Sequence, residues 1–176
     1  MTMAPGVHSI WLMPTADEAA MLTRIVDDLA RRFGTPRFQP HLTLVEDMER
    51  SVGDLAPLVE DVAAGIGPFA APVAAIGVSA LFFRSFYACF VAEGPLLELK
   101  RRAIEKILPG DIAEFMPHIS LAYDVAETLE KRDAVVEVEN LLLANPVHFD
   151  RVCVVASGKE LPIEGWAIRA TAALSN

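Results

Sequence analysis

The chain has 176 residues, which is enough for one domain or for one body built from two small lobes. Apolar residues make up 53% of it, yet its longest apolar runs fall far short of the roughly 20 residues that span a bilayer. The formal net charge is −9. Most of such a surface would repel a long nucleic-acid backbone, so the charge favours an anion of mononucleotide size over a polymer.

The N-terminus and the cysteines both bear on the compartment. Residues 1–10 contain neither the basic region nor the apolar region of a signal peptide. Cys89 and Cys153 lie in apolar, strand-like runs and are interpreted as buried free thiols. We therefore expect a cytoplasmic protein that has no membrane partner.

The first half of the chain begins with a short apolar strand over residues 8–13. A capping box from Thr15 to Glu18 then predicts a helix that Gly34 and Pro36 end. Further elements expected in this half are a strand at 39–46, a helix at 54–65, and a strand at 69–79 in which Pro72 indicates an edge or a bulge.

The second half repeats the order of the first. Its expected elements are a strand at 85–92, a helix at 94–108, a strand at 116–122, a helix at 126–135, and strands at 147–156 and 164–171. A constant offset of 77 residues relates the halves, since it carries His8 onto Ser85, Pro40 onto Pro117, and His41 onto His118. One fixed offset without a gap indicates an internal duplication.

The duplication predicts an α+β fold. We expect a single bilobal domain over residues 1–176, with repeat units at about 8–84 and 85–161 and a last strand at 164–171. Each lobe would hold a mainly antiparallel sheet with helices on its outer face, and the two lobes would surround a central cleft.

Two short segments carry the residues that could do chemistry, Pro40–Leu44 and Pro117–Leu121. Side chains alternate between the faces of a strand, so His41 shares a face with Thr43. By the same parity His118 shares a face with Ser120. If the lobes face each other, the cleft holds two imidazoles and two hydroxyls.

That set suits phosphoryl chemistry. A neutral imidazole can take a proton from water while an imidazolium protonates the departing alkoxide, and the hydroxyls can donate to non-bridging oxygens. One His-x-Thr or His-x-Ser motif would indicate only an ordinary strand histidine. Two copies at the repeat offset are hard to explain without a function, because converging polar pairs otherwise cost desolvation energy.

The paired motifs resemble the tandem signature of the 2H phosphoesterase superfamily. The phrases HSIWLMP, FGTPRFQPHLTLV and PHISLAYD are most similar to its cyclic phosphodiesterase branch, and the resemblance covers about residues 8–172. It implies a bilobal α+β fold without a metal or a cofactor. It also implies hydrolysis of 2′,3′-cyclic nucleotides or of ADP-ribose 1″,2″-cyclic phosphate, with His41 and His118 as the acid–base pair and Thr43 and Ser120 as the phosphate-binding hydroxyls.

The resemblance extends to aromatic residues around the motifs. Trp11 and Tyr123 match positions that line the site in that branch, and Phe86 matches more loosely. For Trp11, core packing and a stacking surface for a base or ribose remain equally good interpretations. Asp124 stands where a glycine is expected, and the cysteine pattern of some plant relatives is absent, so no disulfide is expected.

Other functions remain open at this point. The same paired motif occurs in enzymes that make or cleave 2′–5′ linkages at RNA ends, although the acidic charge argues against a long nucleic acid. A non-catalytic nucleotide-binding module is the third possibility, and a metallohydrolase is the least favoured, because only two histidines converge. We expect a monomer whose partner is a small cyclic phosphate.

Overall fold

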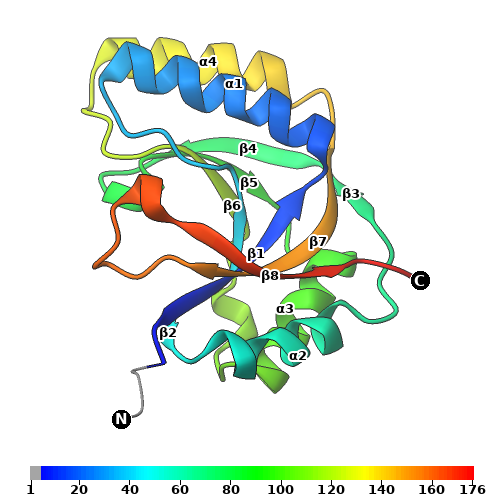
Figure 1. Cartoon of the computed structure of the whole chain (residues 1–176). Coiled ribbons are helices and arrows are strands. Elements are labelled where there is room, and N and C mark those ends of the chain that lie inside the picture. Colours follow the sequence, from blue (N-terminus) through cyan, green and yellow to red (C-terminus); the bar gives the residue numbers. More distant parts are fainter. Residues whose placement is uncertain (1–4) are drawn as a thin grey trace.

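The computed structural model describes residues 5–176, so residues 1–4, on which the interpretation of the N-terminus partly rests, lie outside it. Figure 1 shows the arrangement of the elements. The helices are α1 (Ala16–Phe33), α2 (Val52–Ala63), α3 (Gly94–Lys106) and α4 (Leu129–Leu142), with short 3₁₀ helices η1 (Phe82–Arg84), η2 (Ile112–Glu114) and η3 (Ile163–Gly165). The strands are β1 (Val7–Pro14), β2 (Leu42–Glu49), β3 (Phe69–Ala71), β4 (Val73–Val78), β5 (Phe86–Phe90), β6 (His118–Ala122), β7 (Val147–Ala156) and β8 (Ala167–Ala173). The predicted α+β fold is confirmed.

The ends of the helices show where local signals suffice. Gly34 ends α1 in the left-handed conformation, at φ 66°, as expected of a C-terminal glycine. The prediction of a capping box at the start of α1 is wrong, because the Thr15 side chain makes no capping hydrogen bond. The carboxylate of Glu18 accepts a hydrogen bond from His148 Nδ1 at 2.7 Å instead. A tertiary partner has thus replaced the local one.

Pro72 divides the expected strand 69–79 into two strands at opposite edges of the sheet. The strand order is β3-β7-β1-β2-β6-β5-β4, with β8 paired to β7, and neighbours are antiparallel. Only Pro72 separates β3 from β4 in sequence, so the sheet must curl until its two edges meet there. Proline has no N–H for a ladder bond, which suits a break at this point.

The two expected sheets are two halves of one hydrogen-bonded network. The halves are joined where β2 meets β6 through a single residue pair, Leu42 and Ile119. The third strand of each repeat unit crosses over, since β4 pairs with β5 and β7 pairs with β1. We propose that residues 1–176 form one bilobal domain, because neither repeat unit completes its own sheet. The last strand begins three residues later than expected, after η3.

Helices cover the sheet on two sides. Figure 1 shows α1 and α4 together above the strands and α2 and α3 together below them. The main core contains fully buried strand residues such as Leu42, Leu44, Ile119 and Leu121. A smaller buried cluster, with Trp11 and Cys153 at its centre, lies apart from it. Within residues 5–176, no helix has both the length and the apolar character needed to cross a membrane.

Candidate active site

The single pair between β2 and β6 brings the two motifs together. Leu42 pairs with Ile119, and both side chains are fully buried in the main core. Continuing this antiparallel register by one residue on either side sets His41 opposite Ser120 and Thr43 opposite His118. These four side chains alternate with the core residues and share the other face of the sheet. The expected convergence of two imidazoles and two hydroxyls therefore has a definite location, at the centre of the curled sheet.

Both imidazoles are held in the same way by the backbone. His41 Nδ1 lies 2.8 Å from the carbonyl oxygen of Gln39, and His118 Nδ1 lies 2.8 Å from that of Met116. A carbonyl can only accept, so each Nδ1 carries the hydrogen and each neutral ring keeps its lone pair on Nε2. The carbonyls belong to residues that precede prolines, where the backbone is confined to extended conformations. This restriction explains why Pro40 and Pro117 accompany the motifs.

His41 has an apolar environment. Its ring stacks on the indole of Trp11, with centroids 3.5 Å apart and planes 7° apart, and the residue is only 9% exposed. Burial lowers the pKa of His41 from 6.5 to about 4, and the nearby His118 contributes to the same shift. His41 is therefore neutral near pH 7.

His118 has a more polar environment. The residue is half-buried, and the ring of Tyr87 meets it edge-on with centroids 5.5 Å apart. Burial lowers the pKa of His118, while the charges of Arg84 and Glu46 have opposing, smaller effects. The pKa of His41 is the one with a large displacement, so a single proton shared by the pair resides on His118.

Phe86 is not part of the site, which corrects the expectation from sequence. It is fully buried in the main core, and its neighbour Tyr87 faces the histidines instead. Side chains alternate along β5, so Phe86 and Ala88 face the core while Tyr87 between them faces the histidines. The two strand pairs that precede the motifs also share a register shift. Ile10 pairs with Val45 before Trp11 pairs with Thr43, and the pairing of β5 with β6 shifts at the corresponding point, just before Tyr87 pairs with Ser120.

The shift makes Tyr87 the counterpart of Trp11, at an offset of 76 rather than 77 residues. The gapless offset therefore holds for the motifs and fails by one residue in the preceding strands. Gly77 on β4 gives a signal that sequence reasoning passed over. A Cβ at this glycine would lie 2.4–2.6 Å from atoms of the Tyr87 ring, so the ring lies directly over Gly77. A glycine inside a strand often marks such a close approach.

The 3₁₀ helix η1 is fastened over the end of β6. Ser120 Oγ donates to the Phe83 carbonyl at 2.7 Å, and the N–H of Asp124 donates to the Phe82 carbonyl at 3.0 Å. Asp124 has φ 52°, the left-handed conformation that glycine adopts most easily. The family resemblance leads to a glycine at this position. Asp124 adopts the same backbone conformation that a glycine would take there.

Tyr123 lies within an aromatic cluster rather than in an open cleft. It is 2% exposed and stacks on Phe38 with centroids 3.8 Å apart, and burial raises the pKa of its hydroxyl. Phe83 and Trp166 contact it edge-on. Phe83 is also largely exposed, so η1 presents an aromatic side chain to solvent beside this cluster.

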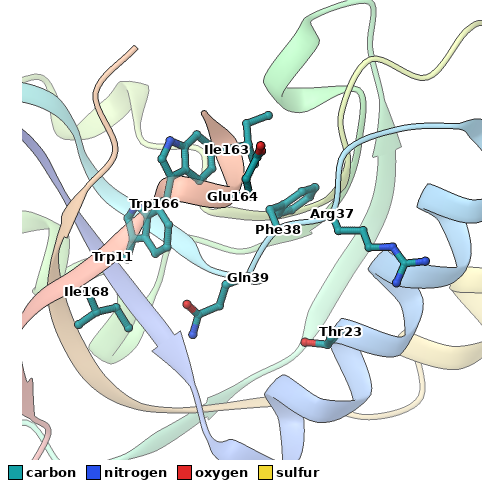
Figure 2. A pocket seen from close by; sticks show the side chains of 9 residues that line it. All are labelled: Trp11, Thr23, Arg37, Phe38, Gln39, Ile163, Glu164, Trp166 and Ile168. Atoms are coloured by element: carbon teal, nitrogen blue, oxygen red, sulfur yellow. The ribbon is translucent and has the colours of Figure 1, made fainter. Parts of the chain in front are cut away.

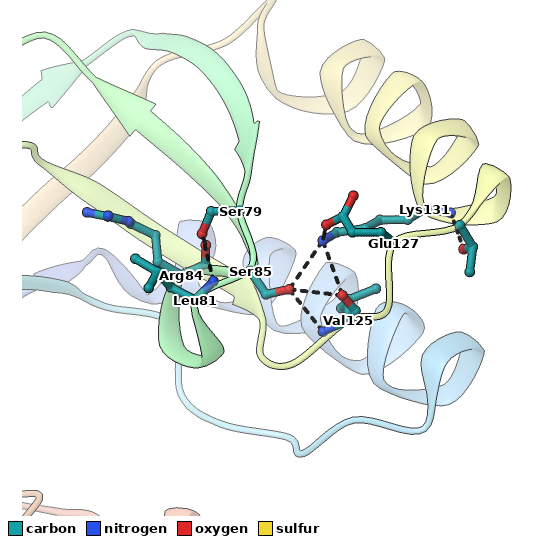
Figure 3. Close-up of polar contacts among 8 residues, drawn as sticks. Ser79, Leu81, Arg84, Ser85, Val125, Glu127 and Lys131 are labelled. Carbon is teal, nitrogen blue, oxygen red and sulfur yellow. Dashed lines mark hydrogen bonds and ion pairs between the residues drawn. The ribbon is translucent and has the colours of Figure 1, made fainter.

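A buried polar network supports the loop after β6 (Figure 3). Ser85 Oγ accepts a hydrogen bond from the N–H of Val125 at 2.9 Å and one from Lys131 Nζ at 3.3 Å. Lys131 is only 1% exposed and also pairs with the carboxylate of Glu127. The network ties the start of β5 to the start of α4, and thereby fixes the segment that contains Tyr123 and Asp124.

A pocket of about 400 Å³ lies beside the His41 half of the site. Figure 2 shows the two indoles together on one side of it and Arg37 and Thr23 on the opposite side. The residues that line it are Trp11, Thr23, Arg37, Phe38, Gln39, Ile163, Glu164, Trp166 and Ile168. The pocket adjoins His41 through Trp11 and Gln39, although neither imidazole lines it.

Comparisons with known proteins agree with the fold, although no family model matches the chain. A cyclic phosphodiesterase of Arabidopsis thaliana is 22% identical over 128 residues, which cover 73% of this chain and 71% of the relative. E. coli LigT in complex with 3′-AMP superposes with a TM-score of 0.61 at 16% identity, covering 98% of this chain and 99% of that one. TT0787 of Thermus thermophilus has a TM-score of 0.59 at 21% identity, covering 96% and 97%. The chain is thus similar in sequence to a cyclic phosphodiesterase and has the fold of E. coli LigT and of TT0787.

Proposed function

We propose that this protein hydrolyses a small cyclic phosphodiester to a phosphate monoester, using His41 and His118 as base and acid and no metal ion. The observation that carries the proposal is the pairing of Leu42 with Ile119. It sets both motifs on adjacent strands with their polar side chains on one face. A phosphorus atom bound over this pair would lie between two imidazoles whose Nε2 atoms are free.

The different environments of the two rings support distinct roles. His41 is the better candidate for the base, because its low pKa keeps it neutral and its Nε2 can accept a proton from water. His118 is the better candidate for the acid, since its pKa is lowered less than that of His41. A bound phosphate anion would raise the pKa of His118 and fill the acid form. The proton would then pass to the departing ribose oxygen.

The two motif hydroxyls differ in their hydrogen bonding before substrate binds. Thr43 is half-buried on β2 and opposite His118, where its hydroxyl can donate to a non-bridging oxygen. Ser120 already donates to the Phe83 carbonyl, so it must exchange that partner for the phosphate. The exchange is favourable, because a hydrogen bond to a charged oxygen is roughly twice as strong as one to a neutral carbonyl. The Phe82 carbonyl keeps its hydrogen bond from the N–H of Asp124, so η1 stays attached to the end of β6.

The neighbouring pocket and the charge support a nucleotide-sized substrate. The pocket next to Trp11 offers two indoles, the ring of Phe38 and a polar rim that includes Arg37 and Thr23. A nucleoside whose phosphate lay at the histidines could place its base there by stacking. We infer a 2′,3′-cyclic nucleotide or ADP-ribose 1″,2″-cyclic phosphate as the substrate class. The acidic surface disfavours a long nucleic acid.

Turnover of a 2′,3′-cyclic nucleotide in the presence of a chelator tests the proposal. Activity should persist with chelator, and His41→Ala and His118→Ala should each abolish it. His148→Ala is the matched control, because His148 is exposed and pairs with Glu18 on α1. Full activity in either of the first two variants would remove that histidine from the mechanism.

A competition experiment separates the remaining alternatives. A preference for oligonucleotides with a steep salt dependence would indicate an enzyme of RNA ends. Tight binding of a cyclic nucleotide without turnover would indicate a binding module. The proposed function predicts instead that the cyclic mononucleotide is turned over and that salt has a small effect.

A further inference from the structure

Arg84 at the end of η1 lies along the histidine side of β6. The residue before it, Phe83, accepts the hydrogen bond of Ser120 through its carbonyl at 2.7 Å. The Arg84 side chain extends from there to Met116, where Nη1 lies 4.0 Å from the sulfur. Side chains at every second position of an extended chain point the same way, which applies to Met116, His118 and Ser120. The arginine therefore runs past His118, on the face that holds both side chains of the second motif. Its charge is close enough to lower the pKa of His118.

The guanidinium of Arg84 has unused hydrogen-bonding capacity. Its Nε is buried and has no hydrogen-bond partner among residues 5–176, and a thioether sulfur is only a weak acceptor for Nη1. No carboxylate lies within ion-pair distance of it in the part of the chain that the structure describes. Other arginines, such as Arg102 on α3, have a carboxylate partner. An unsatisfied buried donor costs free energy that a bound anion would recover.

The chemistry favours a second, fixed cation at this point, because the acid His118 gives up its proton to the departing oxygen. The protein carries a net charge of −9, and His41 is neutral near pH 7. The two hydroxyls can share a hydrogen bond with a phosphate but supply no charge. The cyclic substrate is a monoanion and the product ester is close to a dianion, so the negative charge at phosphorus grows during the reaction. A fixed arginine beside the acid would offset that growth.

We propose that Arg84 is a substrate-binding residue whose guanidinium holds a non-bridging oxygen of the phosphate at the His118 end of the site. This inference rests on the proposed function for the identity of the anion, but its binding step can be measured without turnover. It implies that anions with two negative charges bind more tightly than those with one. The product monophosphate should therefore inhibit the enzyme more strongly than a singly charged phosphodiester of the same nucleoside.

The test is the affinity for inorganic phosphate, followed through the imidazole signals of His118 by NMR. Arg84→Met keeps the length and apolar stem of the side chain but removes its charge and donors. We expect it to weaken phosphate binding by roughly tenfold to a hundredfold, the usual loss of a charge-assisted hydrogen bond. Arg101→Met is the matched control, because Arg101 is exposed on α3 and pairs with Glu98 on the same helix. It should bind phosphate like the unmodified protein.

A second variant and a second signal exclude a merely structural role. Arg84→Gln keeps a polar group at the buried position, so it should unfold at the temperature of the unmodified protein while still losing phosphate affinity. In both Arg84 variants the pKa of His118 without ligand should rise, because the nearby positive charge is gone. Unchanged phosphate affinity in a folded Arg84 variant would overturn the inference.

The two proposals fail in distinguishable ways. If phosphate binding depends on Arg84 but no cyclic phosphodiester is turned over, the proposed function fails and the binding role stands. If cyclic nucleotides are turned over and the Arg84 variants match Arg101→Met in both affinity and kcat/KM, the binding role fails alone.

Discussion

The two halves of the site share a motif and differ in their surroundings. In one half His41 is buried against Trp11, with the ring centroids 3.5 Å apart. In the other half His118 is more open and meets Tyr87 edge-on at 5.5 Å. The same backbone contact through Nδ1 orients both rings. Duplicated motifs can therefore keep one geometry for proton transfer while their neighbours separate the two pKa values.

Under the proposed mechanism, this difference makes His41 the base and His118 the acid. The pKa of His41 is lowered to about 4, whereas His118 lies near a charged arginine and a charged glutamate. Pairs of titratable groups with separated pKa values commonly divide into a base and an acid. Variants in each half test this difference, and the largest effects are expected at the histidines themselves.

The largest effect concerns the leaving group. His41→Gln and His118→Gln should each lower kcat by about 10²–10⁴-fold with a cyclic nucleotide. A nucleoside p-nitrophenyl phosphodiester has a leaving group that departs without a proton. With this substrate His118→Gln should recover most of its activity, while His41→Gln should not. Recovery in the His41 variant instead would exchange the two roles.

The next effect concerns stability in acid. The folded state holds the pKa of His41 at about 4, against 6.5 in the unfolded chain. Below pH 6.5 the unfolded chain binds a proton that the folded state does not. The contribution of neutral His41 to the free energy of unfolding is therefore complete above pH 6.5 and is lost as the pH falls toward 4. Between pH 8 and pH 5, the free energy of unfolding measured in urea should fall by about 2 kcal/mol less for His41→Gln than for the unmodified protein.

The control for the acid experiment is the other half. Between pH 8 and pH 5, His118→Gln should lose more unfolding free energy than His41→Gln does, because His118 is less buried than His41. Equal behaviour of the two variants would mean that the surroundings of the rings do not differ in the way described.

A packing change tests the support of the His118 half. Gly77→Ala would place a Cβ against the Tyr87 ring, and such overpacking costs about 1–3 kcal/mol. Removing the ring as well, in Gly77→Ala with Tyr87→Ala, should recover part of that loss in a double-mutant cycle. Gly53→Ala on α2 is the matched control, since the nearest atom to its Cβ would be Ser51 Oγ at 3.8 Å. A neutral Gly77→Ala would show that the ring does not depend on this glycine.

The smallest effect concerns the loop after β6. Asp124 adopts φ 52°, so Asp124→Gly should relieve strain and raise the unfolding free energy by less than about 1 kcal/mol, because glycine also gains entropy in the unfolded chain. Thermal unfolding measures it. A clear loss of stability would mean that the Asp124 side chain makes a contribution beyond its backbone.

The sequence predicted the parts of the site that depend on strand parity alone. His41, Thr43, His118 and Ser120 lie on one face because side chains alternate, and the core residues between them are buried as expected. Phe86 was assigned wrongly because side chains alternate along β5, where Phe86 faces the core and Tyr87 faces the histidines. The loose match to the family did not fix which of these two neighbours faces the site.

Other features depend on contacts that no local pattern encodes. Arg84 gains its place because η1 folds over β6, which requires the carbonyl of Phe83 to meet Ser120. Pro72 was recognised as an interruption, but its position between two edges of a curled sheet is a property of the whole topology. The start of α1 likewise depends on His148, more than a hundred residues away.

The central claim is that both imidazoles act on one phosphorus atom. The most direct measurement is a crystal structure of the protein soaked with a nucleoside monophosphate. The account predicts a phosphate between the two rings, with one oxygen within about 3 Å of each Nε2. A phosphate bound by one imidazole alone, or seated in the pocket beside Trp11 away from both rings, would contradict it.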